Sequence, residues 1–254
     1  MNFFAPKTAA ERYARGRPFF HPVVLARVKE LLSLTKPLPR ALDVCCGTGL
    51  STVALKSLAE RIVGVDVSLE MLAHAPQGHG VSFCLSAAER LPFDDGAFDL
   101  MTVCQGFHWL EREKFFREAR RVLRPGGWLV VYDNYFSGGM AGREEFDSWF
   151  REKYLGRFPP PPRNWAAFTA DESESLGFHL RAETHLANEI SFSRETLVAF
   201  IASQSNVIAA VEGKGESLEE VNAWLAGGMW PFFGEEREMV FLFDAPIWCL
   251  RRIG

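Results

Sequence analysis

Residues 42–49, Leu42-Asp43-Val44-Cys45-Cys46-Gly47-Thr48-Gly49, combine the end of an apolar stretch with a turn that contains two glycines. Residues 40–45 predict a strand and residues 50–60 predict a helix, so this turn joins a strand to a helix. Glycines there let the backbone approach a ligand closely, and the start of the helix favours anionic groups. A strand–helix turn that binds no ligand has the same local pattern. The rest of the chain therefore has to distinguish a ligand-binding turn from a plain one.

Strands and helices alternate on both sides of this turn. The predicted strands are residues 40–45, 61–66, 81–85, 98–104, 128–132, 180–192 and 239–250, and the predicted helices are residues 22–34, 50–60, 68–74, 111–123, 144–154, 193–203 and 217–225. Strands that alternate with helices imply right-handed crossovers and a mostly parallel sheet. We therefore expect an α/β protein whose sheet begins at residue 40.

The pattern changes after Tyr132, where residues 134–170 are rich in aromatic residues, Gly and Pro. We expect residues 1–133 to form the core with a helical cover at the amino terminus, and residues 134–254 to add a substrate-side lid and the last strands. Residues 158–162, Phe-Pro-Pro-Pro-Pro, must be extended and act either as a stiff linker or as a partner-binding segment. Five aromatic residues form either an apolar lid or the core of a subdomain: Trp149, Phe150, Phe158, Trp165 and Phe168.

Composition narrows the function classes. The 254 residues carry a formal net charge of -4 and no basic run, which argues against nucleic acid as a partner. The five cysteines have neither a disulfide framework nor zinc-site spacing, and no metal site is expected. The sequence lacks a signal-peptide pattern and an apolar run of about 20 residues, so we expect a cytoplasmic protein with no membrane contact. The oligomeric state stays open between monomer and homodimer.

An acidic residue stands at the end of the second predicted strand. Asp66 lies in Gly64-Val65-Asp66-Val67-Ser68, directly after the strand. A carboxylate in this place can accept hydrogen bonds from both hydroxyls of a ribose. The alternative is an aspartate that only stabilises a turn or caps the next helix.

Five segments now stand in order over about residues 40–132. They are residues Leu42–Gly49; Gly64–Ser68 with Met71-Leu72; Ala88-Glu89-Arg90-Leu91-Pro92-Phe93; Asp95–Phe98 with Asp99; and Arg121-Val122-Leu123-Arg124-Pro125-Gly126-Gly127. On these segments the chain resembles class I S-adenosylmethionine-dependent methyltransferases, and within them the small-molecule group called type 11. The resemblance implies a Rossmann-like, doubly wound, mostly parallel seven-stranded sheet with helices on both faces, and S-adenosyl-L-methionine as the cofactor.

The resemblance also implies roles for single residues. Residues beside the methionine part of the cofactor would be Asp43, Cys45, Gly47, Thr48 and Gly49, with Gln105 facing the methyl side. Asp66 would hold the ribose, Val67 and Met71 would flank the adenine, and Ala88 and Glu89 would line its edge. Two positions depart from the family: Cys45 stands where Gly is usual, and Ala87 stands where an acidic residue often binds the adenine amino group. Losing that one contact weakens binding by about 0.5–1.5 kcal/mol rather than abolishing it.

Two further segments are similar to trans-aconitate methyltransferase-like enzymes. In Gln105-Gly106-Phe107-His108-Trp109, His108 is either a general base or a residue that packs beside the cofactor and seats the loop. In Tyr13-Ala14-Arg15-Gly16-Arg17-Pro18-Phe19, Arg17 either pairs with a carboxylate of cofactor or substrate or is an ordinary surface arginine. Tyr13 is a second candidate base.

The sequence thus predicts an enzyme that transfers a methyl group to an oxygen or nitrogen of a small molecule, a carboxylate included, by in-line displacement. One alternative is a methyltransferase-like protein that binds a cofactor or partner without catalysis. Another is an NAD-dependent oxidoreductase, which the missing third glycine of GxGxxG and the missing Tyr-x-x-x-Lys pair argue against.

Overall fold

The computed structural model describes residues 4–164 and 169–254. They form two compact units that interleave along the chain. The first unit comprises the described residues up to Pro18, together with Tyr135–Pro162 and Ala187–Asp244; the second comprises Phe19–Asn134, the described residues of Arg163–Leu186, and Ala245–Gly254. A break after Asn134 lies close to the expected boundary at 133/134, but each unit also takes segments from the other expected half. Trp165 and Phe168 lie outside the described residues.

The second unit is built on a mostly parallel sheet, as expected. Its strands are β1 (Leu38–Val44), β2 (Ala59–Asp66), β3 (Val81–Leu85), β4 (Phe98–Cys104), β5 (Leu123–Tyr132) and part of β8 (Glu238–Arg252). The order is β3-β2-β1-β4-β5-β8; the first five are parallel and β8 is antiparallel to β5. The strand order reverses between β1 and β4, and open α/β sheets bind ligands beyond the carboxyl ends of the strands at such a switch point.

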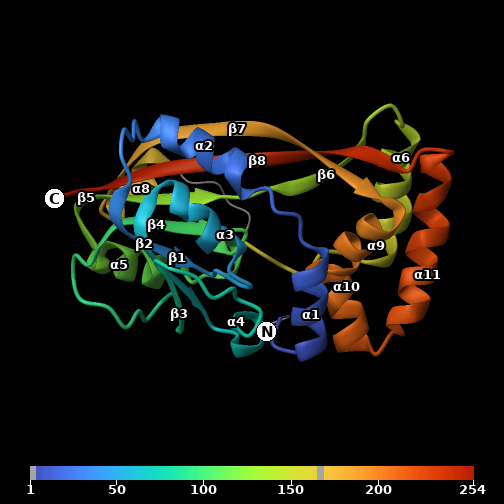
Figure 1. Ribbon diagram of the computed structural model, residues 1–254, viewed down its shortest axis with the longest axis horizontal. Coiled ribbons are helices and arrows are strands. Elements are labelled where there is room, and N and C mark those ends of the chain that lie inside the picture. The colour runs from blue at the N-terminus through green and yellow to red at the C-terminus, as the bar shows by residue number, and fades with distance from the viewer. Residues whose placement is uncertain (1–3, 165–168) are drawn as a thin grey trace. The chain divides into compact units, whose positions relative to one another are not determined.

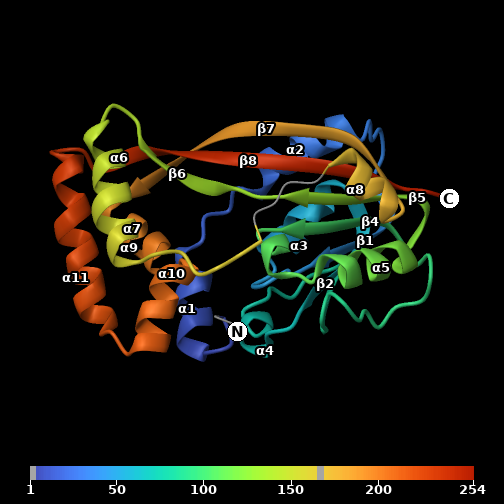
Figure 2. The ribbon, with the colours of Figure 1, turned by 180° about the vertical axis from the view of Figure 1, so that it is seen from behind.

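Helices cover both faces of this sheet (Figures 1 and 2). The helical segments are α2 (His21–Leu31), α3 (Leu50–Ala54), η1 (Leu55–Ser57), α4 (Leu69–Leu72), η2 (Phe107–Trp109), α5 (Arg112–Val122) and α8 (Ala170–Ser175). Helices α2 and α3 lie on one face and α5 on the other. Helix α5 buries Phe115, Phe116, Ala119 and Val122, a spacing that places all four on one side of a helix. The expected helix over residues 50–60 is shorter, because its last turn tightens into η1 before β2 begins.

The first unit is mainly helical and has an aromatic core. It holds α1 (Lys7–Gly16), β6 (Tyr135–Met140), α6 (Glu145–Trp149), the π-helical turn η3 (Phe150–Tyr154), α7 (Leu155–Arg157), α9 (Arg194–Ala202), α10 (Ser205–Ile208), η4 (Ala209–Gly213), α11 (Leu218–Met229) and η5 (Trp230–Phe233). Strand β7 (Phe178–Ser193), like β8, has residues in both units. Trp149, Phe150 and Phe158 pack into this core, as the alternative to an apolar lid requires.

Strand β6 is absent from the sequence prediction, which gives seven strands where the sheet has eight. The strand pairs antiparallel with β8, but its register shifts between Phe136 and Gly139. Gly138 has a φ of 92°, a left-handed backbone conformation that a regular β-strand does not contain. The two glycines and the register shift break the alternation of apolar residues, so the sequence pattern does not predict this strand.

No single helix among residues 4–164 and 169–254 is long and apolar enough to cross a membrane. The bent pair of Arg194–Ala202 and Ser205–Gly213, with 64° between its halves, reaches that length and composition only when taken together.

His21 is a buried titratable residue at the start of α2. Its Nδ1 lies 3.2 Å from the Tyr132 hydroxyl, and Cys104 Sγ lies 3.8 Å from the same nitrogen. Burial lowers the pKa of His21 to about 3. The imidazole is therefore neutral in the folded protein at neutral pH and bridges β4 and β5 with α2.

The buried His21 should make the protein sensitive to acid. An unfolded histidine protonates near pH 6.5, so between that pH and about 3 the unfolded state binds an extra proton and the unfolding free energy falls as the pH drops. We expect His21→Gln to remove about 2–3 kcal/mol of the stability loss between pH 7 and pH 4, measured by urea unfolding. The exposed His79→Gln is the control and should leave the pH dependence unchanged. Equal pH dependence in the wild-type and His21→Gln proteins would contradict the neutral assignment.

Candidate active site

Asp43 is the buried centre of the switch-point edge. It is the next-to-last residue of β1, and its side chain is fully buried. One carboxylate oxygen accepts hydrogen bonds from Ser51 (2.6 Å) and Thr52 (2.7 Å) of α3, and the other accepts one from Thr102 of β4 (2.8 Å). Burial raises the pKa of Asp43 to about 6, although the three hydroxyl donors counteract the shift. This carboxylate therefore ties the helix after the turn to the two strands beside the switch point.

The turn after β1 has an unusual backbone. Cys45, Gly47 and Gly49 all have positive φ, at 59°, 56° and 79°. The amide of Cys46 donates to the carbonyl of Val65 in β2 (3.0 Å), which attaches the turn to the neighbouring strand. Gly47, Thr48 and Gly49 are all buried. Two of the three positive-φ positions are glycines, which adopt this conformation without cost.

Asp66 ends β2 and binds the same turn. Its Oδ2 accepts a hydrogen bond from the Gly47 amide (2.8 Å) and its Oδ1 accepts one from the Ser68 amide (2.9 Å). Burial raises the pKa of Asp66, and these backbone donors oppose the rise. Asp43 and Asp66 thus lie on neighbouring parallel strands, where Asp66 holds the turn and Asp43 holds the helix that follows it. The turn-stabilising alternative for Asp66 is present, and it leaves room for a ligand contact as well.

Cys45 occupies the conformation that glycine usually supplies. With a φ of 59° it is one of three described non-glycine residues at positive φ, the others being Ser33 and Gln105. A Cβ added to Gly106 would lie 2.4 Å from the Cβ and 3.0 Å from the Sγ of Cys45. The departure from the family at position 45 therefore requires a residue without a side chain at position 106.

Residues on the expected adenine side differ in exposure. Val67, directly after Asp66, is 63% exposed, which is high for an apolar side chain, whereas Met71 (4%) and Ala88 (6%) are buried. Glu89 accepts a hydrogen bond from the Glu111 amide at the start of α5 (3.1 Å) through one oxygen. Ala87, which lacks the acid often found in the family, lies next to this group.

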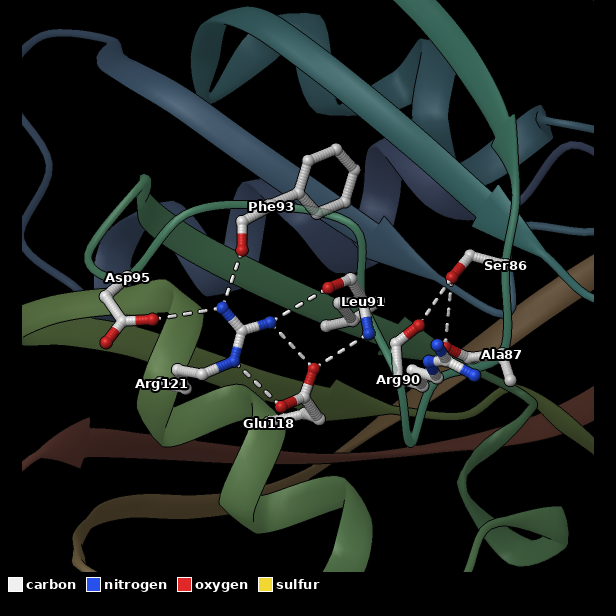
Figure 3. A network of polar contacts seen from close by, with 8 residues as sticks. All are labelled: Ser86, Ala87, Arg90, Leu91, Phe93, Asp95, Glu118 and Arg121. Carbon is white, nitrogen blue, oxygen red and sulfur yellow. Dashed lines mark hydrogen bonds and ion pairs between the residues drawn. The ribbon is translucent and has the colours of Figure 1, made fainter.

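A polar network fixes the loop that carries Ala88 and Glu89 (Figure 3). Arg121 of α5 donates to the carbonyls of Leu91 (2.8 Å) and Phe93 (2.6 Å) and pairs with Glu118 (2.8 Å) and Asp95 (3.0 Å). Glu118 in turn accepts the Leu91 amide at 2.7 Å. The guanidinium thus acts as a clamp on loop 86–95, which explains an arginine at this place in the sequence.

The end of β4 forms the other side of the switch point. Gln105 has a φ of 53° and donates from Nε2 to the carbonyl of Asn134 after β5 (2.7 Å). His108 lies in η2 with its ring 4.9 Å from that of Trp109, and its carbonyl accepts the Asn164 amide (3.4 Å). The Arg163 guanidinium lies 4.7 Å from the centre of the Trp109 ring.

Asp133 and Arg163 were missed by the sequence analysis. Asp133 follows β5 directly, and its pKa rises to about 7 because it is buried, although the charge of Arg163 and the Gln105 amide counteract the rise. The signal in the sequence was an acidic residue at the carboxyl end of a predicted strand. Arg163 had no such signal, because it follows a proline run and reaches the site only through the fold.

Tyr13 and Arg17 belong to the first unit. The Arg17 guanidinium lies 4.6 Å from the Tyr13 ring centre and 5.7 Å from that of Phe200, and it donates to the Ser203 carbonyl (3.2 Å). Arg17 is thus held by its own unit rather than lying loose on the surface. Among residues 4–164 and 169–254, no group of three or more His, Cys, Asp and Glu side chains is placed to hold a metal ion.

Comparison with known proteins agrees with this geometry. The Methyltransf_11 model, a methyltransferase domain, matches residues 42–131. An uncharacterized methyltransferase of Mycobacterium tuberculosis (strain ATCC 25618 / H37Rv) is 34% identical over 226 residues, which cover 86% of this chain and 84% of that protein. The chain belongs to the class I S-adenosylmethionine-dependent methyltransferases. This methyltransferase uses S-adenosylmethionine as its cofactor.

One further relative matches only part of the methyltransferase, whereas solved structures match most of it. A Dictyostelium discoideum protein named as a methyltransferase is 34% identical over 92 residues, and the chain spans 35% of its length. Among solved structures, a protein of Anaeromyxobacter dehalogenans named as a type II methyltransferase has a TM-score of 0.68 at 22% identity, covering 90% of this chain and 96% of that one. The [4+2]-cyclase SpnF has the same fold, with a TM-score of 0.53 at 23% identity. The fold alone therefore does not determine the reaction.

The contact between Cys45 and Gly106 gives a prediction on stability. Gly106→Ala should cost about 1–3 kcal/mol, because its Cβ would overlap the Cβ of Cys45. In the Cys45→Gly background the same substitution should cost less than about 0.5 kcal/mol, since its next nearest atom, the Cys104 carbonyl oxygen, is 3.7 Å away. Urea unfolding of the four proteins measures this coupling.

Gly156→Ala is the matched control, because a Cβ there meets no atom within 4 Å. It should show no coupling to position 45. Additive effects of the substitutions at positions 45 and 106 would rule out the proposed packing constraint.

Proposed function

We propose that this methyltransferase transfers a methyl group to an oxygen or nitrogen of a small molecule, with its cofactor bound at the switch point of the sheet in the second unit. The observation that carries the proposal is the turn over residues 45–49, which Asp66 holds at Gly47 while Asp43 holds the helix that follows the turn. The strand order reverses beside this turn, where open α/β sheets bind ligands.

Asp66 is proposed to bind the ribose. Its oxygens accept backbone hydrogen bonds from Gly47, Ser68 and Val67, and a carboxylate can accept about four in all. Some acceptor capacity of the carboxylate is therefore left for the ribose. Exposed Val67 and the edge of Met71 are proposed to flank the adenine, with Ala88 and the second oxygen of Glu89 at its rim.

The methionine part is proposed to lie along Cys45, Gly47, Thr48 and Gly49. Asp43 is not proposed to contact the cofactor, because it is fully buried and its oxygens already accept three hydroxyls. Its proposed role is to hold the helix that follows the turn. Gln105, held by the Asn134 carbonyl, is proposed to face the methyl side.

A small-molecule acceptor is supported by charge and by the relatives. The net charge of -4 disfavours a polyphosphate backbone as substrate. A Thermus thermophilus relative, 36% identical over 140 residues, is a demethylmenaquinone methyltransferase, and a Marinomonas relative, 35% identical over 141 residues, is a malonyl-[acyl-carrier protein] O-methyltransferase. We propose an acceptor of modest size, as the first of these names implies.

The protein contributes alignment, and the bound cofactor supplies an electrophilic methyl group. Holding the acceptor atom about 3–3.5 Å from the methyl carbon lowers the barrier by several kcal/mol. His108, which lies in the same unit as the proposed cofactor turn, is proposed to position the acceptor.

The ribose assignment predicts a loss of affinity. We expect S-adenosylmethionine and S-adenosylhomocysteine both to bind the wild-type protein in calorimetric titrations. Asp66→Ala should weaken both by about 1–3 kcal/mol, roughly 5–150-fold, because two hydroxyls lose their acceptor. Exposed Asp94→Ala is the control and should bind as the wild type does. Because Asp66 also holds the Gly47 amide, thermal unfolding of each variant is measured to check that it is folded. Asp66→Asn is the milder substitution. Unchanged affinity in a folded Asp66→Ala protein would remove the assignment.

His108 is expected to act outside cofactor binding. His108→Ala should bind S-adenosylhomocysteine within about threefold of the wild type, less than 1 kcal/mol, because its ring packs on Trp109. Calorimetry again provides the measurement. A folded His108→Ala protein that no longer binds would instead place His108 in the cofactor shell.

A further inference from the structure

Asp133 stands at the same edge of the sheet as the proposed cofactor turn. Cys104 of β4 and Tyr132 of β5 are paired in register, so the residues that follow them, Gln105 and Asp133, leave the sheet side by side. The Gln105 amide donates to the Tyr132 carbonyl (3.2 Å) and also to the Asp133 carboxylate. Asp133 is therefore fixed next to the residue proposed to face the methyl side.

Two titratable side chains among the described residues interact with the charge of Asp133. The charged group that faces it is Arg163, from the segment before α8, and the phenol of the adjacent Tyr132 is the other titratable group that senses its charge. From β8, the Pro246 carbonyl binds its backbone amide (3.1 Å) and contributes no charge. Removal from water raises the pKa of Asp133 to about 7, so both protonation states are populated near neutral pH.

Three carboxylates at this edge differ in how much of their bonding capacity is already used. Asp43 accepts three hydroxyls and is fully buried, and Asp66 accepts three backbone amides. Asp133 accepts the backbone amide of Gln105. Of the three, Asp133 has the most capacity left to accept a hydrogen bond from the group that is methylated.

We propose that Asp133 lies on the methyl side of the site and is the proton acceptor for the hydroxyl or amine that is methylated. This inference rests on the proposed function and names a residue that the sequence analysis did not assign. A base of this kind works best when it titrates near the working pH.

The step balances with Asp133 ionised. The acceptor O–H or N–H gives its proton to the carboxylate while the lone pair of that oxygen or nitrogen forms the bond to the methyl carbon. The electrons of the carbon–sulfur bond stay on sulfur, which leaves neutral S-adenosylhomocysteine, the methylated acceptor and a protonated Asp133. Water takes the proton afterwards.

The same charge selects the acceptor. An ionised carboxylate needs no base and would be repelled by ionised Asp133, whereas a neutral hydroxyl or amine is attracted as a hydrogen-bond donor. Asp133 therefore favours acceptors that lose a proton over carboxylates that already carry a charge.

The experiment measures protons and needs no acceptor. S-adenosylmethionine carries a positive sulfonium and S-adenosylhomocysteine carries a neutral sulfur, so only the first should drive ionisation of a carboxyl beside the methyl group. Calorimetric titration at pH 7 in buffers of different ionisation enthalpy counts the protons released. At a pH equal to the pKa half of the Asp133 side chains are protonated, so the difference between the two ligands should approach about half a proton.

Asp133→Asn should remove this difference while both ligands still bind, and Asp133→Glu should keep part of it. Asp99→Asn is the matched control: Asp99 is paired with Arg124 at the opposite, amino end of β4, and its loss should leave the difference intact. Equal proton release by the two ligands in the wild type, or an unchanged difference in Asp133→Asn, overturns the inference. Failure of both ligands to bind the wild type contradicts the cofactor site instead, so the two failures are distinguishable.

Discussion

The buried carboxylate of Asp43 is the constraint on which this site depends. A charged group without water is costly, and three hydroxyl donors from α3 and β4 reduce that cost. In exchange they fix the spacing of the helix and both strands at the point where the strand order reverses. Removing the Thr102 hydroxyl would leave one buried carboxylate oxygen without its donor, which costs more than the bond itself.

Two hydrogen bonds from the neighbouring strand hold the turn that precedes α3. Asp66 holds the Gly47 amide from the neighbouring strand, and the Val65 carbonyl holds Cys46. The conformation at Cys45 is strained for a residue with a side chain, and the space that its side chain needs is left by Gly106 across the switch point. The side chain at position 45 thus depends on a glycine about sixty residues away in the sequence.

The prediction from sequence was good where the signal is local. The strand before the turn, the aspartate at the end of the next strand and helix α5 follow from apolar spacing and from turn residues. Strand β6 was missed because Gly138 and Gly139 break the alternation. Asp133 and Arg163 were missed for a different reason: each matters only through neighbours that are distant in the sequence.

The sequence by itself determined strands β1 to β5 with the helices between them, the glycine-containing turn and the two acidic residues beside it, because these depend on residues close together in the chain. Only the tertiary structure decided that Asp43 is saturated by hydroxyls, that Cys45 packs on Gly106, and that Asp133 lies beside Gln105 with a raised pKa. Burial and hydrogen bonding of a carboxylate are set by the segments that fold against it, and local spacing does not contain that information.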